Sequence, residues 1–440
     1  MPQHSSIVVS AALVLLIGCA EQQPPTALAS AAINAPVAAK NGDVVHVGTV
    51  GESGVLSVDG AVTTYNTGYG SAVALVPGTS RDFYLLTDRG PNIDLAGGNK
   101  GFVAPGFTPR IVRAHLSGNK LRIDGSIPLR RADGTPLTGL PIGAGGCGST
   151  GEIGFTLGTV PVALPADPNG LDSEGLVALP DGTFWLSDEY GPFIAHYGAD
   201  GREIQRLSPC PGGGLPPVYL KRRPNRGMEG LTITPDGKWL VGIMQAPLEN
   251  PSSTGVRNTS RFTRILFRNL TTGATKEYGY LLEDATLQGN SEILALSDTR
   301  FLVLERDGNF LANAPTTLFK RIYEADISAA TEISTLGALG ATPIPATAST
   351  GARTLEQATA AQLAAARIVT ARKTLAVDLA LVGYPHDKAE GLALAPGGML
   401  FVSNDDDFGI TSGSGFSLIQ KLLPPTNVVD FVSLWQVRLR

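Results

Sequence analysis

The sequence is short of charged residues, of cysteine and of long apolar runs, and each shortage disfavours a class of protein. Charged residues make up 17% of the 440 residues, and the net charge is −5. The basic run Lys221, Arg222, Arg223 is short, so the composition argues against a general nucleic-acid-binding protein. The chain also has no Gly-x-Ser-x-Gly elbow, zinc-ligand spacing or dinucleotide fingerprint in a strand-to-helix context. What it does have, 53 glycines and 31 prolines, predicts a protein rich in strands and turns.

The longest apolar run lies near the N-terminus, over residues 7–17. It is too short to span a bilayer, and it ends at Leu-Ile-Gly-Cys before polar, proline-rich sequence. Residues 1–19 therefore resemble a bacterial lipoprotein signal, in which cleavage before Cys19 leaves that thiol to be lipidated. We expect an exported protein, held at the outer membrane or in the periplasm through Cys19 alone, with residues 20–40 as a flexible tether. An ordinary secretory signal and a secreted protein are the alternative.

Two cysteines then remain, Cys147 and Cys210, in loops rich in glycine and proline. An oxidising compartment permits a disulfide between them, and the sequence leaves open whether it forms. A thiol nucleophile is disfavoured because neither cysteine has a neighbouring histidine or basic residue to lower its pKa.

The stretch DSEGLVALPDGTFWLSDEYG, residues 172–191, predicts a β-hairpin. Residues 176–179 and 183–186 suit strands, and the Pro-Asp-Gly between them is a turn signal. In an antiparallel hairpin the start of the first strand lies beside the end of the second. Glu174 should therefore lie on the same edge as Asp188 and Glu189.

This hairpin recurs along the chain, at residues 68–92, 225–248, 289–310 and 387–409. Two further strands follow the clearest copy, and four antiparallel strands form one propeller blade. We therefore predict an all-β fold, a β-propeller formed by residues 41–440 as one domain, with insertions at about 131–170 and 333–372. The five copies and an N-terminal strand pair, residues 44–50 and 54–62, favour six blades, with five to seven open. That pair could complete the last blade and close the ring.

The Ala-rich residues 354–372 lie within the second insertion and predict a surface helix. At helical spacing, Leu355, Ala358, Ala366 and Val369 share one face.

The acids of the repeated hairpins should meet at one rim of the propeller, because the innermost strands line the central channel. Carboxylates gathered in a small volume require compensation, and a hard cation with oxygen ligands, Ca²⁺ before another divalent ion, provides it. The predicted metal ligands are Glu174, Glu229, Glu292, Glu390, Asp88, Asp188 and Asp405. A structural role, in which each Glu binds backbone N–H groups, is the alternative.

The repeated motifs resemble the phytase-like propeller family known as "esterase-like activity of phytase". They are Glu-Gly-Leu, Pro-Asp-Gly and Asp-Glu over 174–189, Met-Glu-Gly-Leu over 228–231, Ser-Glu-Ile-Leu to Leu-Glu-Arg over 291–306, and Ala-Glu-Gly-Leu to Asp-Phe-Gly over 389–409. The resemblance covers about residues 65–435 and implies clustered Glu and Asp at the active face. Two positions depart from the family pattern: Gln245 stands where Glu is common, and Asp406 where Asn is usual.

The resemblance and the acid rim together predict metal-assisted hydrolysis of a small phosphoester, with Glu189 or Glu305 handling the proton. Arg89, Arg226 and Arg306 lie near these acids in the sequence. Together with His386 they are the predicted substrate-binding residues, and for the arginines a purely structural pairing with the acids is the alternative. A lactonase or carboxylesterase with His386 as base, and a non-catalytic Ca²⁺-stabilised binding propeller, are the alternatives. We expect a monomer.

Overall fold

The structure is a computed structural model that describes residues 44–49, 53–58, 61–287, 289–348, 350–414 and 417–439. The predicted signal, Cys19 and the tether of residues 20–40 lie outside these ranges. Within them, no helix combines the length and apolar character needed to cross a membrane.

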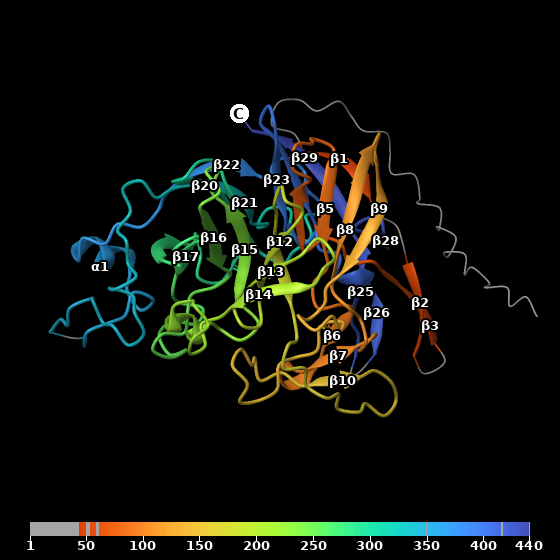
Figure 1. Cartoon of the computed structure of the whole chain (residues 1–440), viewed down its shortest axis with the longest axis horizontal. Helices are drawn as coiled ribbons and strands as arrows, with labels where there is room; N and C mark the ends of the chain where they lie inside the picture. Colours follow the sequence, from red (N-terminus) through yellow and green to blue (C-terminus); the bar gives the residue numbers. More distant parts are fainter. Residues whose placement is uncertain are drawn as a thin grey trace, which may run out of the picture.

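Five antiparallel sheets of four strands each make up the body of the described chain (Figure 1). From the innermost strand outward, the sheets are β4 (Ala72–Leu75), β5 (Asp82–Leu86), β8 (Arg110–Ser117) and β9 (Lys120–Pro128); β11 (Ser173–Ala178), β12 (Phe184–Asp188), β13 (Ile194–Tyr197) and β14 (Glu203–Leu207); β15 (Met228–Ile233), β16 (Trp239–Met244), β17 (Phe262–Asn269) and β18 (Thr275–Leu281); β19 (Gly289–Ala295), β20 (Arg300–Arg306), β21 (Lys320–Asp326) and β22 (Arg372–Asp378); and β23 (Leu392–Ala395), β24 (Met399–Ser403), β29 (Ser433–Arg438) and β1 (Val44–Thr49).

The innermost strands contact one another in the cyclic order β4, β11, β15, β19, β23, and β23 contacts β4. This closed ring confirms the predicted propeller. The four-stranded sheets among the described residues number five, fewer than the six blades that the sequence favoured and within the range of five to seven that it left open. Strand β1 pairs with β29 as the outer strand of the last blade, while β2 (Ser53–Val58) and β3 (Ala61–Asn66) form a separate hairpin (Figure 1).

Each blade packs both of its faces against a neighbouring blade. In β20, Leu302 and Leu304 are buried against β23 and β24, whereas Phe301 and Val303 are buried against β16 and β17. This alternation follows from the two-residue period of a strand, and it explains why the hairpin strands are almost continuously apolar.

Shorter strands lie in the loops between these sheets. They are β6 (Asn92–Asp94), β7 (Lys100–Phe102), β10 (Gly154–Thr156), β25 (Ile410–Ser412), β26 (Leu418–Gln420), β27 (Leu422–Leu423) and β28 (Val428–Val429). Strand β10, in the first insertion, pairs with β7.

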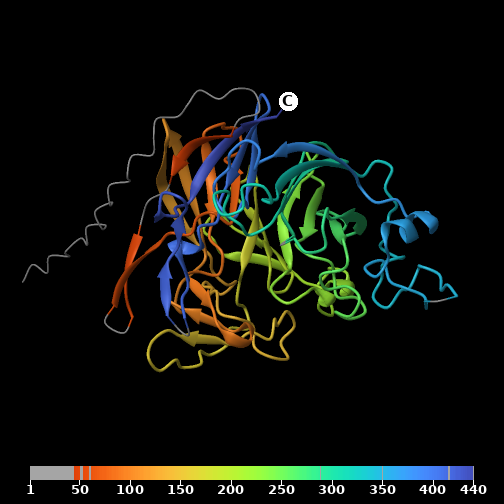
Figure 2. The same ribbon diagram turned by 180° about the vertical axis from the view of Figure 1, so that it is seen from behind.

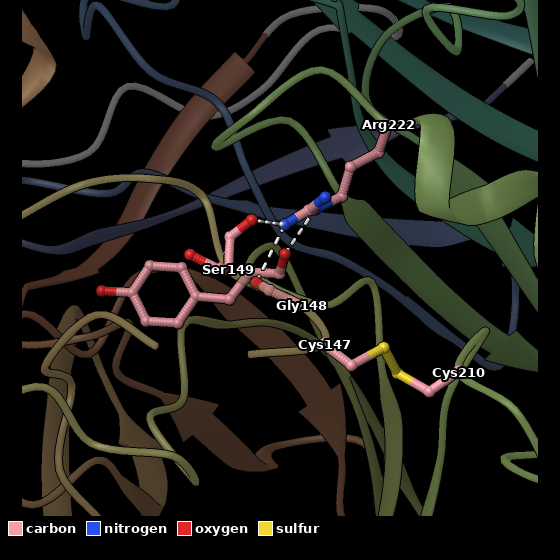
Figure 3. The surroundings of a disulfide bond; sticks show 6 residues. Cys147, Gly148, Ser149, Cys210 and Arg222 are labelled. Carbon is pink, nitrogen blue, oxygen red and sulfur yellow. Dashed lines mark hydrogen bonds between the residues drawn. A yellow bond between two sulfur atoms is a disulfide. The ribbon is translucent and has the colours of Figure 1, made fainter. Parts of the chain in front are cut away.

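A disulfide joins Cys147 of this insertion to Cys210, the pairing that the sequence left open (Figure 3). Beside it, the guanidinium of Arg222 donates to the carbonyl oxygens of Gly148 and Ser149 at 2.8 and 2.9 Å. The disulfide and Arg222 thus fasten the insertion to the loop that leads into β15.

The second insertion stands at the edge of the molecule in both views (Figures 1 and 2). Its helix α1 (Ala360–Ala365) is much shorter than the helix predicted over 354–372. Thr359 caps its start with a capping box, and Arg367 adopts a left-handed φ of 59° that ends it. Leu355 and Ala358 are buried as expected, but Val369 is exposed.

Candidate functional site

Two of the three Glu-Gly-Leu motifs open an innermost strand at an irregularity in strand pairing. The register shifts between Ser173 and Leu176 in β11 and between Met228 and Gly230 in β15. Such bulges bend a strand and re-aim its side chains. Glu174 and Glu229 lie at these bulges, at the start of their strands.

The glycine of the motif is required by close approach of the next blade. A Cβ placed on Gly175 would lie 2.7 Å from the backbone nitrogen of Leu231, and one on Gly230 would lie 2.4 Å from that of Ile293. Any larger residue would push neighbouring inner strands apart. The motif therefore sets both the spacing of the blades and the position of the carboxylates.

A polar cavity of about 350 Å³ lies where these strand starts meet, and residues from all five blades line it. Nine acids line it: Asp88, Asp94, Glu174, Glu189, Glu229, Asp387, Glu390, Asp405 and Asp407. Five bases line it: Arg89, Lys100, Arg226, Arg306 and Lys388. The acids therefore outnumber the bases by four.

The cavity brings together most of the predicted site residues. Those that line it are Glu174, Glu189, Glu229, Glu390, Asp88, Asp405, Arg89, Arg226 and Arg306. Those that do not are Asp188, Glu292, Glu305 and His386.

Asp172, Glu174 and Glu189 form a carboxylate cluster at the start of β11, with one oxygen of each within 4.8 Å of the others. Arg89 compensates part of this charge: its Nη2 lies 2.5 Å from Asp172 Oδ2 and 3.4 Å from Glu189 Oε2. Glu152, from the disulfide-bonded insertion, approaches the same guanidinium at 3.5 Å. The hairpin geometry predicted from the sequence is correct, since Ser173 pairs with Asp188 across the sheet.

Glu229 is 2% exposed, and its charge interacts with that of Glu174 in this cluster. Gln245 donates to its Oε1 at 2.8 Å, whereas its buried Oε2 has no hydrogen-bond partner among the described residues. A buried carboxylate oxygen without a donor is costly unless it is protonated or binds a cation.

Burial and mutual repulsion raise the pKa values of these acids. For Glu174 and Glu189 burial is the main cause and Glu229 the next, and both pKa values are well above the ordinary range. Burial, followed by Glu390, raises the pKa of Glu229 to about 8. Burial, followed by Asp405, raises that of Asp88. Without a cation, the cavity therefore holds protons at neutral pH.

Ion pairs organise the rest of the lining. Arg306 pairs with Glu390, and its Nε donates to Ser291 at 2.7 Å. Lys388 donates to Asp405 Oδ2 at 2.7 Å and also bonds Asp407.

The predicted site residues outside the cavity have structural partners. Glu305, a predicted catalytic residue, pairs with Lys373 and accepts from Tyr280 at 2.6 Å. Glu292 accepts the backbone N–H of Leu231 at 3.1 Å, the structural role left open by the sequence.

The remaining two also bond within the protein. Asp188, the last residue of β12, accepts the N–H of Tyr190 at 2.7 Å, whereas the next residue, Glu189, lines the cavity. His386 is buried, and its Nδ1 lies 2.7 Å from Asp430. Asp406, one of the departures from the family pattern, accepts from Asn66 at 2.7 Å.

Sequence reasoning missed Asp172, Lys388 and Asp407. Asp172 lies two residues before Glu174, and Asp407 continues the Asp405-Asp406 run, so both were within the quoted motifs. Lys388 precedes Glu390 by two residues, but a lysine there carries no signal until the fold places it between carboxylates.

Comparisons with known proteins give one curated relative and several distant structural likenesses. The "Uncharacterized secreted protein" of Arthroderma benhamiae is 31% identical over 261 residues, which are 48% of this chain and 50% of that protein. The chain thus spans about half the length of the curated relative it matches. The periplasmic gluconolactonase of Pseudomonas aeruginosa is 13% identical, with 91% of this chain and 98% of that chain covered and a TM-score of 0.35. The aldose sugar dehydrogenase of Streptomyces coelicolor is 13% identical, with 92% and 100% covered and a TM-score of 0.30.

The family described as "Phytase-like: Esterase-like activity of phytase" matches residues 67–408. This range contains all five innermost strands and every acid and base that lines the cavity. The chain belongs to this phytase-like family.

Proposed function

We propose that the protein is a divalent-cation-dependent hydrolase that cleaves phosphoesters in the cavity. The observation that carries the proposal is the composition of the lining, nine acids and five bases in one buried space. The excess acids call for a cation, and the arginines and lysines suit an anionic substrate.

The residues present fit a cation such as Ca²⁺. Asp172, Glu174 and Glu189 offer oxygens close enough to bind one ion. Oxygen ligands of this kind are those that Ca²⁺ prefers. A bound ion would supply Lewis acidity toward phosphate oxygens.

The chain's own residues would orient the substrate and move the proton. Arg89, Arg306 and Lys388 line the cavity as charged donors for phosphate oxygens. Glu229, whose pKa is about 8 in the cation-free cavity, is the proposed proton carrier. The sequence favoured Glu189 or Glu305 for this role; Glu189 lies in the cation cluster, and Glu305 is bound to Lys373.

We also propose that the chain is exported. The lipoprotein-like residues 1–19 and the name of the Arthroderma benhamiae relative, a secreted protein, support export. Anchoring through Cys19 is the finer proposal, and metabolic labelling with a fatty acid in the wild type and in Cys19→Ala tests it.

Hydrolysis by the purified full chain tests the proposed activity. The panel contains phosphomonoesters, phosphodiesters and lactones, each assayed with Ca²⁺ and then with a chelator. We expect phosphoester turnover that the chelator abolishes. Turnover of lactones alone would contradict the phosphoester assignment, and no turnover, with a melting temperature still raised by Ca²⁺, would indicate a binding propeller instead.

A further inference from the structure

The last blade carries a second group of acids that faces the cavity. Asp387, Asp405 and Asp407 all line it, and Asp430 lies behind them against Lys421. Together with the cluster at β11, this arrangement would suit two divalent ions, as in two-metal sites. Whether a second ion can bind depends on two lysines that contact the carboxylates of the last blade.

Lys388 and Lys421 already bind these carboxylates. Lys388 Nζ lies 2.7 Å from Asp405 Oδ2 and also contacts Asp407 Oδ1. Lys421, whose side chain is 5% exposed, lies 2.8 Å from Asp407 Oδ2 and 2.9 Å from Asp387 Oδ1. Each oxygen of Asp407 thus has its own ammonium partner.

The backbone is shaped to hold Asp407 between the lysines. Asp407 and Phe408 have left-handed φ angles of 49° and 57°. This backbone region is unfavourable for residues other than glycine, so the surroundings must enforce the conformation. Asp406 caps this turn by accepting the N–H of Phe408 at 3.0 Å, and the side chain of Asn66 holds Asp406.

We infer that Lys388 and Lys421 occupy the place of a second cation, so that the cavity binds one divalent ion, at Asp172, Glu174 and Glu189. The inference rests on the cation site of the proposed function, but it concerns a different set of side chains. Its consequence is that removal of Lys388 creates a second divalent site. Two oxygens that both touch one ammonium nitrogen are close enough to touch one Ca²⁺ ion.

Calorimetric titration of the chelator-treated full chain with Ca²⁺ tests the inference. We expect one ion in the wild type and two in Lys388→Met, the second bound more weakly because fewer carboxylates surround it. Lys388→Arg retains the charge and should bind one. Lys388→Met combined with Asp405→Asn removes a ligand of the new site and should return the count to one.

Lys100→Met is the matched control. It also removes one positive charge from the cavity, but its partner Asp94 has a 78% exposed side chain. Lys100→Met should still bind one Ca²⁺ ion, because a more negative cavity without a second set of converging carboxylates does not form a second binding site. If Lys388→Met does not fold, Lys421→Met tests the inference independently, since it leaves Asp387 and Asp407 without their Lys421 partner.

The outcomes separate this inference from the proposed function. Two ions in the wild type, or one ion in wild type and in both lysine variants, would overturn the inference and leave the cation-dependent hydrolase standing. No ion in the wild type and one in Lys388→Met would support the role inferred for the two lysines and contradict the cation site at Asp172, Glu174 and Glu189. No ion in any of these proteins would contradict both.

Discussion

The Nε2 of Gln245 lies 2.8 Å from the Oε1 of Glu229, so a neutral amide orients one of the carboxylates that line the cavity. The family commonly has Glu at the position of Gln245. Here the amide satisfies one oxygen of Glu229 and leaves the other facing the cavity without a donor among the described residues. A single unsatisfied buried carboxylate oxygen is the feature expected of a proton carrier or a cation ligand.

Stability of the cation-free protein should fall as the pH rises. The pKa of Glu229 is about 8 in the folded state, against an ordinary 4.5. Between these values the folded protein holds a proton that the unfolded chain has released, so the free energy of unfolding decreases with pH. The melting temperature in chelator should therefore be lower at about pH 9 than at about pH 5.

Glu229→Gln provides the control for this pH dependence. The variant should weaken the pH dependence without abolishing it, because the pKa values of Glu174 and Glu189 are also raised. Ca²⁺ should weaken it in the wild type. A wild-type melting temperature that rises through this window in chelator would contradict the assignment.

Glu292→Leu should reduce stability without changing cation binding. Glu292 lies outside the cavity and accepts the backbone N–H groups of Leu231 and Ile293 at 3.1 and 2.9 Å. Their loss should cost about 1–3 kcal/mol in denaturant unfolding. The Ca²⁺ stoichiometry should match that of the wild type. Loss of a bound ion would show that Glu292 is a metal ligand, as the sequence predicted.

Arg89→Met should make the protein depend more strongly on Ca²⁺. The substitution leaves Asp172 and Glu189 buried without their guanidinium partner. We expect a loss of about 3–5 kcal/mol in chelator.

Added Ca²⁺ should restore much of that loss, so its effect on the melting temperature should exceed that in the wild type. Arg206→Met, which breaks the pair with Glu203 outside the cavity, should show the wild-type response. Equal Ca²⁺ responses in all three proteins would show that Arg89 does not neighbour the cation.

Loss of the disulfide should destabilise the chain by about 2–4 kcal/mol, because Cys147 and Cys210 close a long loop. Denaturant unfolding of the double Cys147→Ser, Cys210→Ser variant measures this loss. Reductant should destabilise the wild type and leave the variant unchanged; an effect on the variant would point to another cause.

Local sequence signals predicted the hairpins, the propeller and nine of the cavity residues, because turn chemistry and the Glu-Gly-Leu motif act within one strand pair. The blade count depended on the N-terminal strand pair: the sequence suggested that it could complete the last blade, and the structure pairs β1 with β29 there and leaves β2 in a separate hairpin. The helix over 354–372 was overextended because the cap at Thr359 and the left-handed Arg367 limit it.

The differences between the predicted site and the cavity lining have a similar origin. The sequence placed both Asp188 and Glu189 in the site, but only Glu189 lines the cavity, because neighbouring residues of an extended chain point in opposite directions. Glu305 repeats the motif position of a cavity acid, but Tyr280 and Lys373 bind it on the other side of its strand. Only the folded structure shows that Lys388 lines the cavity, because the sequence around it gives no such signal.

The central claim is that the acids of the cavity serve both cation binding and hydrolysis, and the rate of phosphoester hydrolysis by Glu174→Gln with Glu229→Gln tests it most directly. The wild type should turn over with Ca²⁺ and lose activity in chelator. The double variant should fold, fail to bind Ca²⁺ and lose on the order of 100-fold or more in rate. A double variant that keeps the wild-type rate would contradict the account.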